Sequence, residues 1–187
     1  IRGKGLRNGL PSKITIHDNP KNDGIYFKRG NTITKVNPEI LHGNDTTTTM
    51  LFENQMSVVC IEHLLSALYG LGVRDAIIEL DGGNEVPILD GDSFSFIKRI
   101  YFNLRFESML VDTFCFNKSV TVYDEEDNFR YIKLSPTQQK NLEIDAIVSY
   151  ENSNIKLQKL VFNFENKEKY IEEISHAKTS YPLMILS

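Results

Sequence analysis

An apolar stripe at helical spacing is the feature that most constrains how this 187-residue chain folds. The stripe consists of Ile61, Leu64, Leu65, Leu68 and Leu71. Residues three and four apart share one face of a helix, so this face has to be buried against a second layer. Gly70 and Gly72 follow, and glycine at this place favours the end of a helix. The stretch therefore predicts a short amphipathic helix in a layered domain.

The segments around this helix are typical of strands. Alternating polar and apolar residues indicate a strand with one buried face, and β-branched runs bounded by glycine or asparagine turns indicate extended structure. Strands are predicted over 12–17, 25–28, 45–52 and 76–80, and a second helix over 93–102. This mixture of strands and helices predicts the α+β class.

Two strand patterns of the first half recur in the second. Lys118–Val122 echoes Ser12–Ile16, and Phe129–Lys133 echoes Gly24–Lys28. Two more strands, over 142–150 and 156–164, and a helix after the N-cap residue Asn166 complete the second half. We interpret this as a weak internal repeat of two similar layered domains, residues 1–107 and 113–187. Chance similarity between short strands is the alternative.

The second predicted domain is incomplete. In the first half a strand, a turn and a second helix follow the helix, whereas the second half continues for only about a dozen residues after its helix. A sheet covered by one helix leaves apolar surface uncovered. We therefore expect the 113–187 region to expose part of its sheet or helix.

Composition excludes several classes of partner. The net charge of −4, with no basic stripe, argues against a nucleic-acid surface. No apolar run approaches the roughly 20 residues of a membrane span. Cys60 and Cys115 lack metal or disulfide spacing, which fits a reducing cytoplasm. We expect both thiols to be buried apolar groups.

An acid and an imidazole stand side by side at the start of the first helix. Glu62 and His63 lie beside the apolar stripe, and His63 shares its face with the small residues Ala67 and Gly70, which permit another element to approach. A carboxylate beside a metal-bound imidazole is the arrangement that activation of water requires. The residues alone leave a second interpretation open, a solvated first-turn acid and a structural histidine.

These residues belong to a longer pattern. Its parts are Ile61–Leu68, Gly70–Val73, Ala76–Glu79 and Glu85–Gly91, together with Gly3–Gly9, Gly24–Arg29 and Ile174–Thr179. In this order they resemble S-T-V-E-H-L-L-A-A-L-x-G-L-G-I-D-N, E-V-P-I-M-D-G-S, G-x-G-L-H-S-G, G-I-x-F-x-R and I-x-x-A-R-T. These are motifs of the zinc-dependent UDP-3-O-acyl-N-acetylglucosamine deacetylases of lipid A biosynthesis. The similarity covers nearly the whole chain.

The resemblance implies a function and roles for three residues. It implies zinc-dependent hydrolytic deacetylation of a UDP-linked acylated amino sugar, in the cytoplasm of a Gram-negative bacterium. Glu62 aligns with the general base, His63 with one zinc ligand, and Thr179 with the threonine that stabilises the oxyanion. It assigns no substrate-binding residue. Asp90 and Gly91 are interpreted as structural, a local hydrogen bond and a backbone turn.

The chain also departs from the family pattern. Arg7 replaces a histidine, Cys60 a threonine, and Ser180 an aromatic residue. The H-K-x-x-D motif that supplies the other zinc ligands is absent from the sequence, and His176 falls at a variable motif position.

These departures decide what the chain can do alone. A catalytic zinc ion takes about three protein ligands. We therefore expect this chain alone to bind zinc weakly and to be inactive, unless a missing C-terminal half or a complementing chain completes the site. The alternatives are a catalytically inert binding module that retains the fold and holds an acyl chain or a partner protein, and a purely structural domain.

Overall fold

The computed structural model describes residues 1–44, 47–52, 56–105, 115–127, 129–138, 141–149 and 156–179. Contacts divide the chain into two compact units. The first unit is Ile1–Leu104 together with Asn166–Ser187, and the second is Arg105–Glu165. Strands and helices occur together in the chain, so the predicted α+β class is confirmed.

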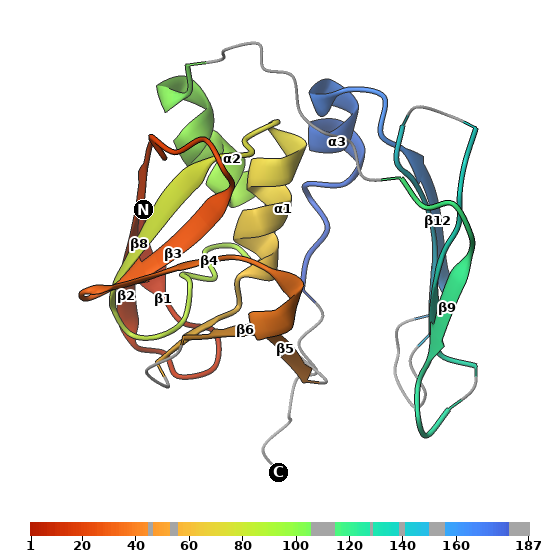
Figure 1. Cartoon of the computed structure of the whole chain (residues 1–187), viewed down its shortest axis with the longest axis horizontal. Helices are drawn as coiled ribbons and strands as arrows, with labels where there is room; N and C mark the ends of the chain where they lie inside the picture. The colour runs from red at the N-terminus through yellow and green to blue at the C-terminus, as the bar shows by residue number, and fades with distance from the viewer. Residues whose placement is uncertain are drawn as a thin grey trace. The chain divides into compact units, whose positions relative to one another are not determined.

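A five-stranded mixed sheet forms one layer of the first unit (Figure 1). Its strands, in spatial order, are β1 (Arg2–Lys4), β2 (Pro11–His17), β8 (Ala76–Gly82), β3 (Ile25–Arg29) and β4 (Thr32–Lys35). β3 and β8 run parallel, and the other neighbours are antiparallel. The strands predicted over 12–17, 25–28 and 76–80 are therefore present.

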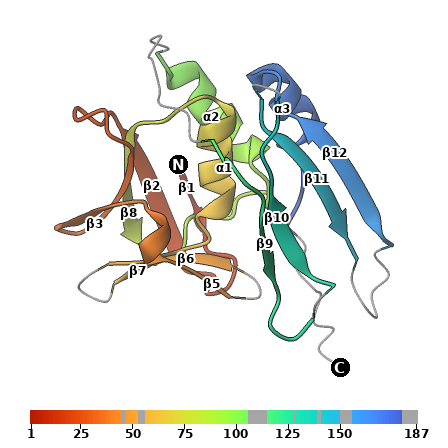
Figure 2. The ribbon, with the colours of Figure 1, turned by 45° about the vertical axis from the view of Figure 1, so that its right-hand side comes forward.

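Helices α1 (Glu62–Gly70) and α2 (Phe94–Ile100) form the second layer (Figure 2). The core between the layers contains Ile14, Phe27, Ile78 and Leu80 from the sheet, with Leu64, Leu68, Phe96 and Ile97 from the helices. Of the predicted stripe, Leu65 is half-buried and the others are buried. A 3-10 turn, Tyr101–Asn103, follows α2.

A small antiparallel sheet leads into α1. It contains β5 (Leu41–Asn44), β6 (Thr47–Leu51) and β7 (Ser57–Val59), and a 3-10 turn at Pro38–Ile40 precedes it. β6 confirms the extended structure predicted over 45–52 for its described residues, while residues 45 and 46 lie outside them. Because β7 ends two residues before the helix, this sheet sets where α1 begins.

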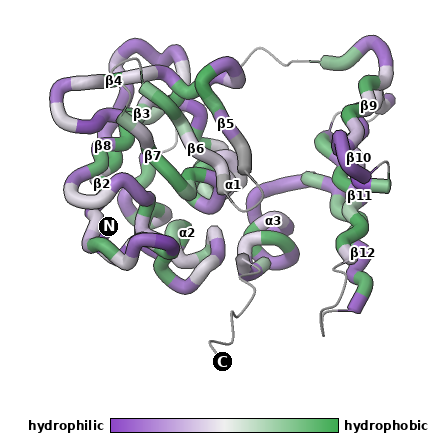
Figure 3. The backbone as a smooth tube through the Cα atoms, turned by 90° about the horizontal axis from the view of Figure 1, so that it is seen from below, coloured by the Kyte–Doolittle hydropathy of each residue, from purple (hydrophilic) through white to green (hydrophobic). Residues whose placement is uncertain are grey.

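The second unit contains two antiparallel strand pairs. β9 (Val120–Tyr123) pairs with β10 (Tyr131–Leu134), and β11 (Glu143–Val148) pairs with β12 (Gln158–Asn163). Hydrophobic and hydrophilic residues alternate along these strands (Figure 3). Many of the apolar side chains are exposed, with Val122 at 65%, Ile132 at 72% and Ile147 at 62%. The predicted uncovered apolar surface is thus present.

The two predicted halves differ in how their strands pair. β2 and β3 each pair with β8, which follows α1 in the chain and lies between them, whereas β9 pairs directly with β10. In the described residues after α3 (Lys167–Glu173) no strand takes the place that β8 has in the first unit. The repeat therefore extends to single strands and not to their pairing.

Helix α3 belongs with the first unit and not with the second half of the chain. Its buried Tyr170 covers Gly70 of α1, and the Tyr170 hydroxyl lies 2.6 Å from the Ser66 hydroxyl. The small residues of α1 thus admit another element, as predicted. The contact units do not coincide with the expected domains 1–107 and 113–187, because α3 buries its aromatic side chain on α1. The division of the family fold at 107–113 stays a prediction.

Replacing Gly70 by Ala is expected to destabilise the chain by about 1–3 kcal/mol, because a Cβ at this position would overlap the Tyr170 ring. In a helix without this contact the same change would be favourable by about 1 kcal/mol. Urea unfolding of Gly70→Ala alone and in a Tyr170→Ala background measures both values. The sign of the effect should reverse between the two backgrounds, and equal effects would contradict the packing.

Candidate active site

The expected base begins helix α1. A Glu62 carboxylate oxygen (Oε2) accepts a hydrogen bond from the Thr48 backbone N–H at 3.3 Å. The Thr48 carbonyl accepts one from the Cys60 N–H at 3.0 Å. A single residue of β6 therefore holds the chain on both sides of the entry into the helix. Glu62 and His63 are both half-buried, so the carboxylate and the imidazole keep access to solvent.

Cys60 makes the turn into the helix. Its φ of 59° lies in the left-handed region, which is uncommon for a residue with a side chain. Burial raises the pKa of the Cys60 thiol to about 12, and the nearby Glu62 and Glu85 carboxylates add to this rise. The thiol is thus protonated and poorly nucleophilic at neutral pH. The prediction of a buried cysteine is confirmed for Cys60 and wrong for Cys115, which is exposed just before β9 in the sparsely covered second unit.

Glu85 anchors the N-terminal glycine motif, a role that sequence reasoning missed. Its buried carboxylate accepts backbone N–H groups of Arg7 at 2.9 Å and Asn8 at 3.0 Å. A Cβ at Gly5 would lie 2.5 Å from a Glu85 oxygen (Oε2), so this loop needs glycine there. Glu85 also bridges Val59 of β7, which places it near the entry to α1. The only sequence signal was its place at the head of the E-V-P motif.

The other end of this motif makes a tight turn before α2. Gly91 has a φ of +77°, and the Asp90 carboxylate accepts a hydrogen bond from the Ser95 hydroxyl at 2.8 Å. The structural roles predicted for Asp90 and Gly91 are therefore confirmed. Asp92, which the sequence analysis did not single out, accepts the Ser95 N–H at 2.9 Å with its buried carboxylate.

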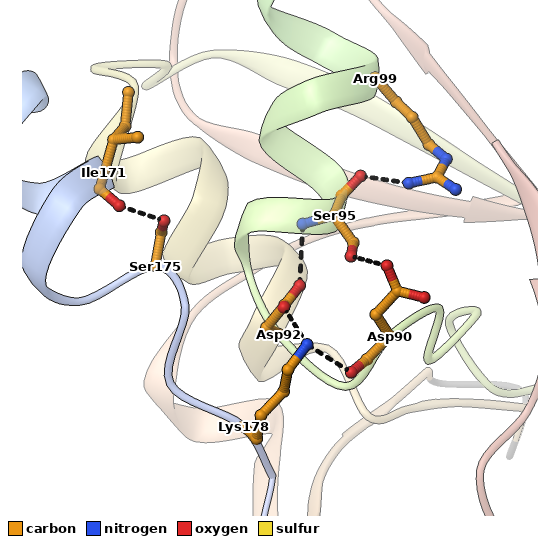
Figure 4. Close-up of polar contacts among 7 residues, drawn as sticks. All are labelled: Asp90, Asp92, Ser95, Arg99, Ile171, Ser175 and Lys178. Atoms are coloured by element: carbon orange, nitrogen blue, oxygen red, sulfur yellow. Dashed lines mark hydrogen bonds and ion pairs between the residues drawn. The ribbon is translucent and has the colours of Figure 1, made fainter.

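The segment after α3 lies on this turn (Figure 4). The Thr179 N–H donates to the Gly91 carbonyl at 2.8 Å, and a Cβ at Gly91 would lie 3.2 Å from the Thr179 methyl carbon (Cγ2). The Lys178 ammonium group donates to the Asp90 carbonyl at 3.0 Å and pairs with the Asp92 carboxylate. The half-buried Thr179 is thereby held through its own backbone and its neighbour's side chain.

The segment Glu85–Gly91 connects the two expected catalytic residues. It begins beside Val59, three residues before Glu62, and ends at the carbonyl that holds Thr179. Fully extended it spans about 20 Å. The segment after α3 runs alongside α1 toward the end where this helix begins (Figure 1). The structure therefore brings the segments of Glu62 and Thr179 to one side of the first unit.

The described residues do not make a catalytic zinc site. No group of three or more histidine, cysteine, aspartate or glutamate side chains that could hold a metal ion occurs among them. The His176 ring stacks on Phe94 with ring centroids 4.0 Å apart, so this histidine packs at the start of α2. Since a catalytic zinc ion takes about three protein ligands, the described donors do not fit one.

The pKa of the buried Asp92 carboxylate is lowered to about 2. Burial by itself would raise it, but hydrogen bonds from Lys178 and Ser95 outweigh that effect. A pKa below the unfolded value stabilises the fold above pH 4, and this stability is lost as pH falls toward 2.

Asp92→Asn should therefore destabilise the chain by about 2 kcal/mol at pH 7. The difference from wild type should shrink between pH 4 and pH 2, as measured by urea unfolding across this range. Asp81→Asn is the matched control, because this exposed aspartate, paired with Lys13, should change stability by less than about 1 kcal/mol. A pH-independent loss for Asp92→Asn would contradict the assignment.

Comparison with known proteins identifies the family. A sequence model of the UDP-3-O-acyl N-acetylglycosamine deacetylase family matches residues 1–183. The chain belongs to this family. Among its relatives, the UDP-3-O-acyl-N-acetylglucosamine deacetylases of Wigglesworthia glossinidia brevipalpis and Campylobacter fetus subsp. fetus are 28% and 32% identical to it. The matches cover 96% and 95% of this chain, and 60% and 58% of those proteins.

The family assignment frames two further findings. The chain spans about 60% of the length of the relatives it matches, so their whole-protein properties do not transfer to it directly. None of the helices in the described ranges combines the length and hydropathy that crossing a bilayer requires. Ser180, the expected departure from an aromatic residue, lies outside the described residues.

Proposed function

We propose that this chain supplies part of the active site of a zinc-dependent UDP-3-O-acyl-N-acetylglucosamine deacetylase of lipid A biosynthesis. The observation that supports this most is the placement of Glu62 and Thr179. Both segments lie on one side of the first unit, joined by the E-V-P motif, in a chain that matches the family over residues 1–183. The expected location of the enzyme, the cytoplasm of a Gram-negative bacterium, is part of the proposal.

The proposed reaction is hydrolysis of an acetamide. Glu62 takes a proton from a water molecule whose oxygen bonds to the acetyl carbon, and the C–N bond then breaks to leave acetate and the free amino sugar. The Thr179 hydroxyl donates a hydrogen bond to the oxyanion of the tetrahedral intermediate. The held backbone of Thr179 and the fixed start of α1 keep these two groups in place.

Zinc is proposed as the cofactor of the whole site. Of its ligands this chain would contribute His63, whose half-buried imidazole stands beside the base. The described residues do not supply the rest, so the remaining ligands would come from outside them. The same finding favours the second candidate function, a catalytically inert module that retains the fold and binds an acyl chain or a partner protein.

The test compares the chain with a chimera in which the chain is followed by the corresponding remainder of the Campylobacter fetus relative. The chain alone should show no measurable deacetylation of UDP-3-O-acyl-N-acetylglucosamine and weak zinc uptake, because one histidine does not hold a catalytic ion. The chimera should turn over the substrate with one zinc ion bound, measured by acetate release and metal analysis.

His63→Ala in the chimera should lower its zinc affinity, since one metal ligand is lost. His42→Ala is the matched control, because this exposed histidine of β5 should leave zinc content unchanged. Robust turnover by the chain alone would refute the expected need for further ligands. An inactive, folded chimera would favour the binding module.

A further inference from the structure

The contacts around Thr179 assign roles to two residues that the proposed function leaves unused. Two consecutive carbonyl groups of the turn, those of Asp90 and Gly91, each accept a hydrogen bond from the segment that carries Thr179. The donors are also consecutive, the Lys178 ammonium group and the Thr179 N–H. The turn and the segment are therefore joined at adjacent positions.

Asp92 provides the fixed side of this junction. Its carboxylate is 4% exposed, and the Ser95 N–H at the first turn of α2 holds one of its oxygens at 2.9 Å. Lys178 holds the other oxygen. Removing the lysine would leave a buried carboxylate oxygen without its counter-charge, which is costly.

The frame around this junction is itself well connected. Ser95 donates through its hydroxyl to Asp90 at 2.8 Å, and its carbonyl accepts from Arg99 at 2.6 Å. Upstream, the buried Ser175 donates to the Ile171 carbonyl at 2.6 Å, and its own carbonyl accepts the Phe94 N–H at 2.9 Å. The segment between 175 and 179 is thus tied at both ends to α2 or the turn before it.

We infer that Lys178 and Asp92 are positioning residues that hold the Thr179 hydroxyl in its place in the active site. The inference rests on the proposed function for the role of Thr179, while the junction itself is independent of it. A hydrogen-bond donor acts on an oxyanion only within a narrow range of positions, and a displacement of about 1 Å can cost a large part of the rate. Lys178 acts through the backbone and does not touch the reacting atoms.

The first experiment needs no activity. Hydrogen exchange of the Thr179 amide is measured by NMR in the chain and in its Lys178→Met variant. Opening of the junction should speed this exchange about tenfold or more, while Lys178→Arg, which keeps the ion pair, should stay near wild type. Lys118→Met, at an exposed lysine of the second unit, is the matched control. Unchanged exchange in Lys178→Met would overturn the inference, whatever the function.

The second experiment uses the chimera. Lys178→Met should lower kcat about tenfold or more with little change in KM, and Lys178→Arg should restore most of the loss. In a Thr179→Val background Lys178→Met should have no further effect on kcat, because the hydroxyl that it positions is gone. Additive losses would overturn the positioning role. If the unsubstituted chimera is inactive, the proposed function and the catalytic role of Lys178 fail together, and the exchange result still decides whether the junction exists.

Discussion

Glu62→Gln in the chimera is expected to lower turnover by about 10²–10⁴-fold while zinc content stays near its original value. The amide cannot accept the proton of the attacking water, so the base is lost. Its carbonyl oxygen can still accept the Thr48 N–H, so the start of α1 keeps its hydrogen bond. The measurements are kcat for acetate release and metal analysis of the same samples.

Two comparisons make this result specific. Glu39→Gln changes an exposed glutamate in the 3-10 turn Pro38–Ile40 and should leave turnover unchanged. Thr179→Val should also lower kcat, by roughly 10²–10³-fold if its hydroxyl donates to the oxyanion. A chimera that is indifferent to Glu62→Gln would remove the proposed mechanism, even if zinc and substrate still bind.

Amide hydrogen exchange in the second unit is expected to be faster than in the core of the first by about a hundredfold or more. The reason is the difference in burial between the two sheets. Ile14, Phe27 and Ile78 are fully buried in the first unit, whereas Val122, Ile132 and Ile147 are more than half exposed in the second. Mass spectrometry of peptic fragments of the exchanged chain measures this difference.

Helix α3 sharpens the same experiment. If it belonged with the preceding strands, its amides would exchange as fast as theirs. Since Tyr170 is buried on α1, amides of α3 should instead exchange with those of the first unit. Tyr170→Ala should release α3 without changing β11 and β12. Uniform strong protection across residues 1–104 and 115–163 would contradict the difference between the units.

The sequence alone determined the local elements and the family. The period of three to four in the Leu64 stripe and the period of two in Ser12–His17 encode which face of each element is buried, and a helix or strand follows from neighbouring residues. The motifs likewise identified Glu62 and His63 at the start of a helix, and Gly91 at a turn.

Only the tertiary structure decided which elements meet. Nothing in the local pattern shows that β8 lies between β2 and β3, or that the Glu85 carboxylate holds the loop at Arg7 and Asn8. Tyr170 meets Ser66 across 104 residues, and Lys178 meets Asp92 across 86. Such contacts depend on shape and charge that become complementary only when distant segments are packed together. Local periodicity therefore predicted the helix that carries the base, whereas the junction that holds Thr179 became visible only in three dimensions.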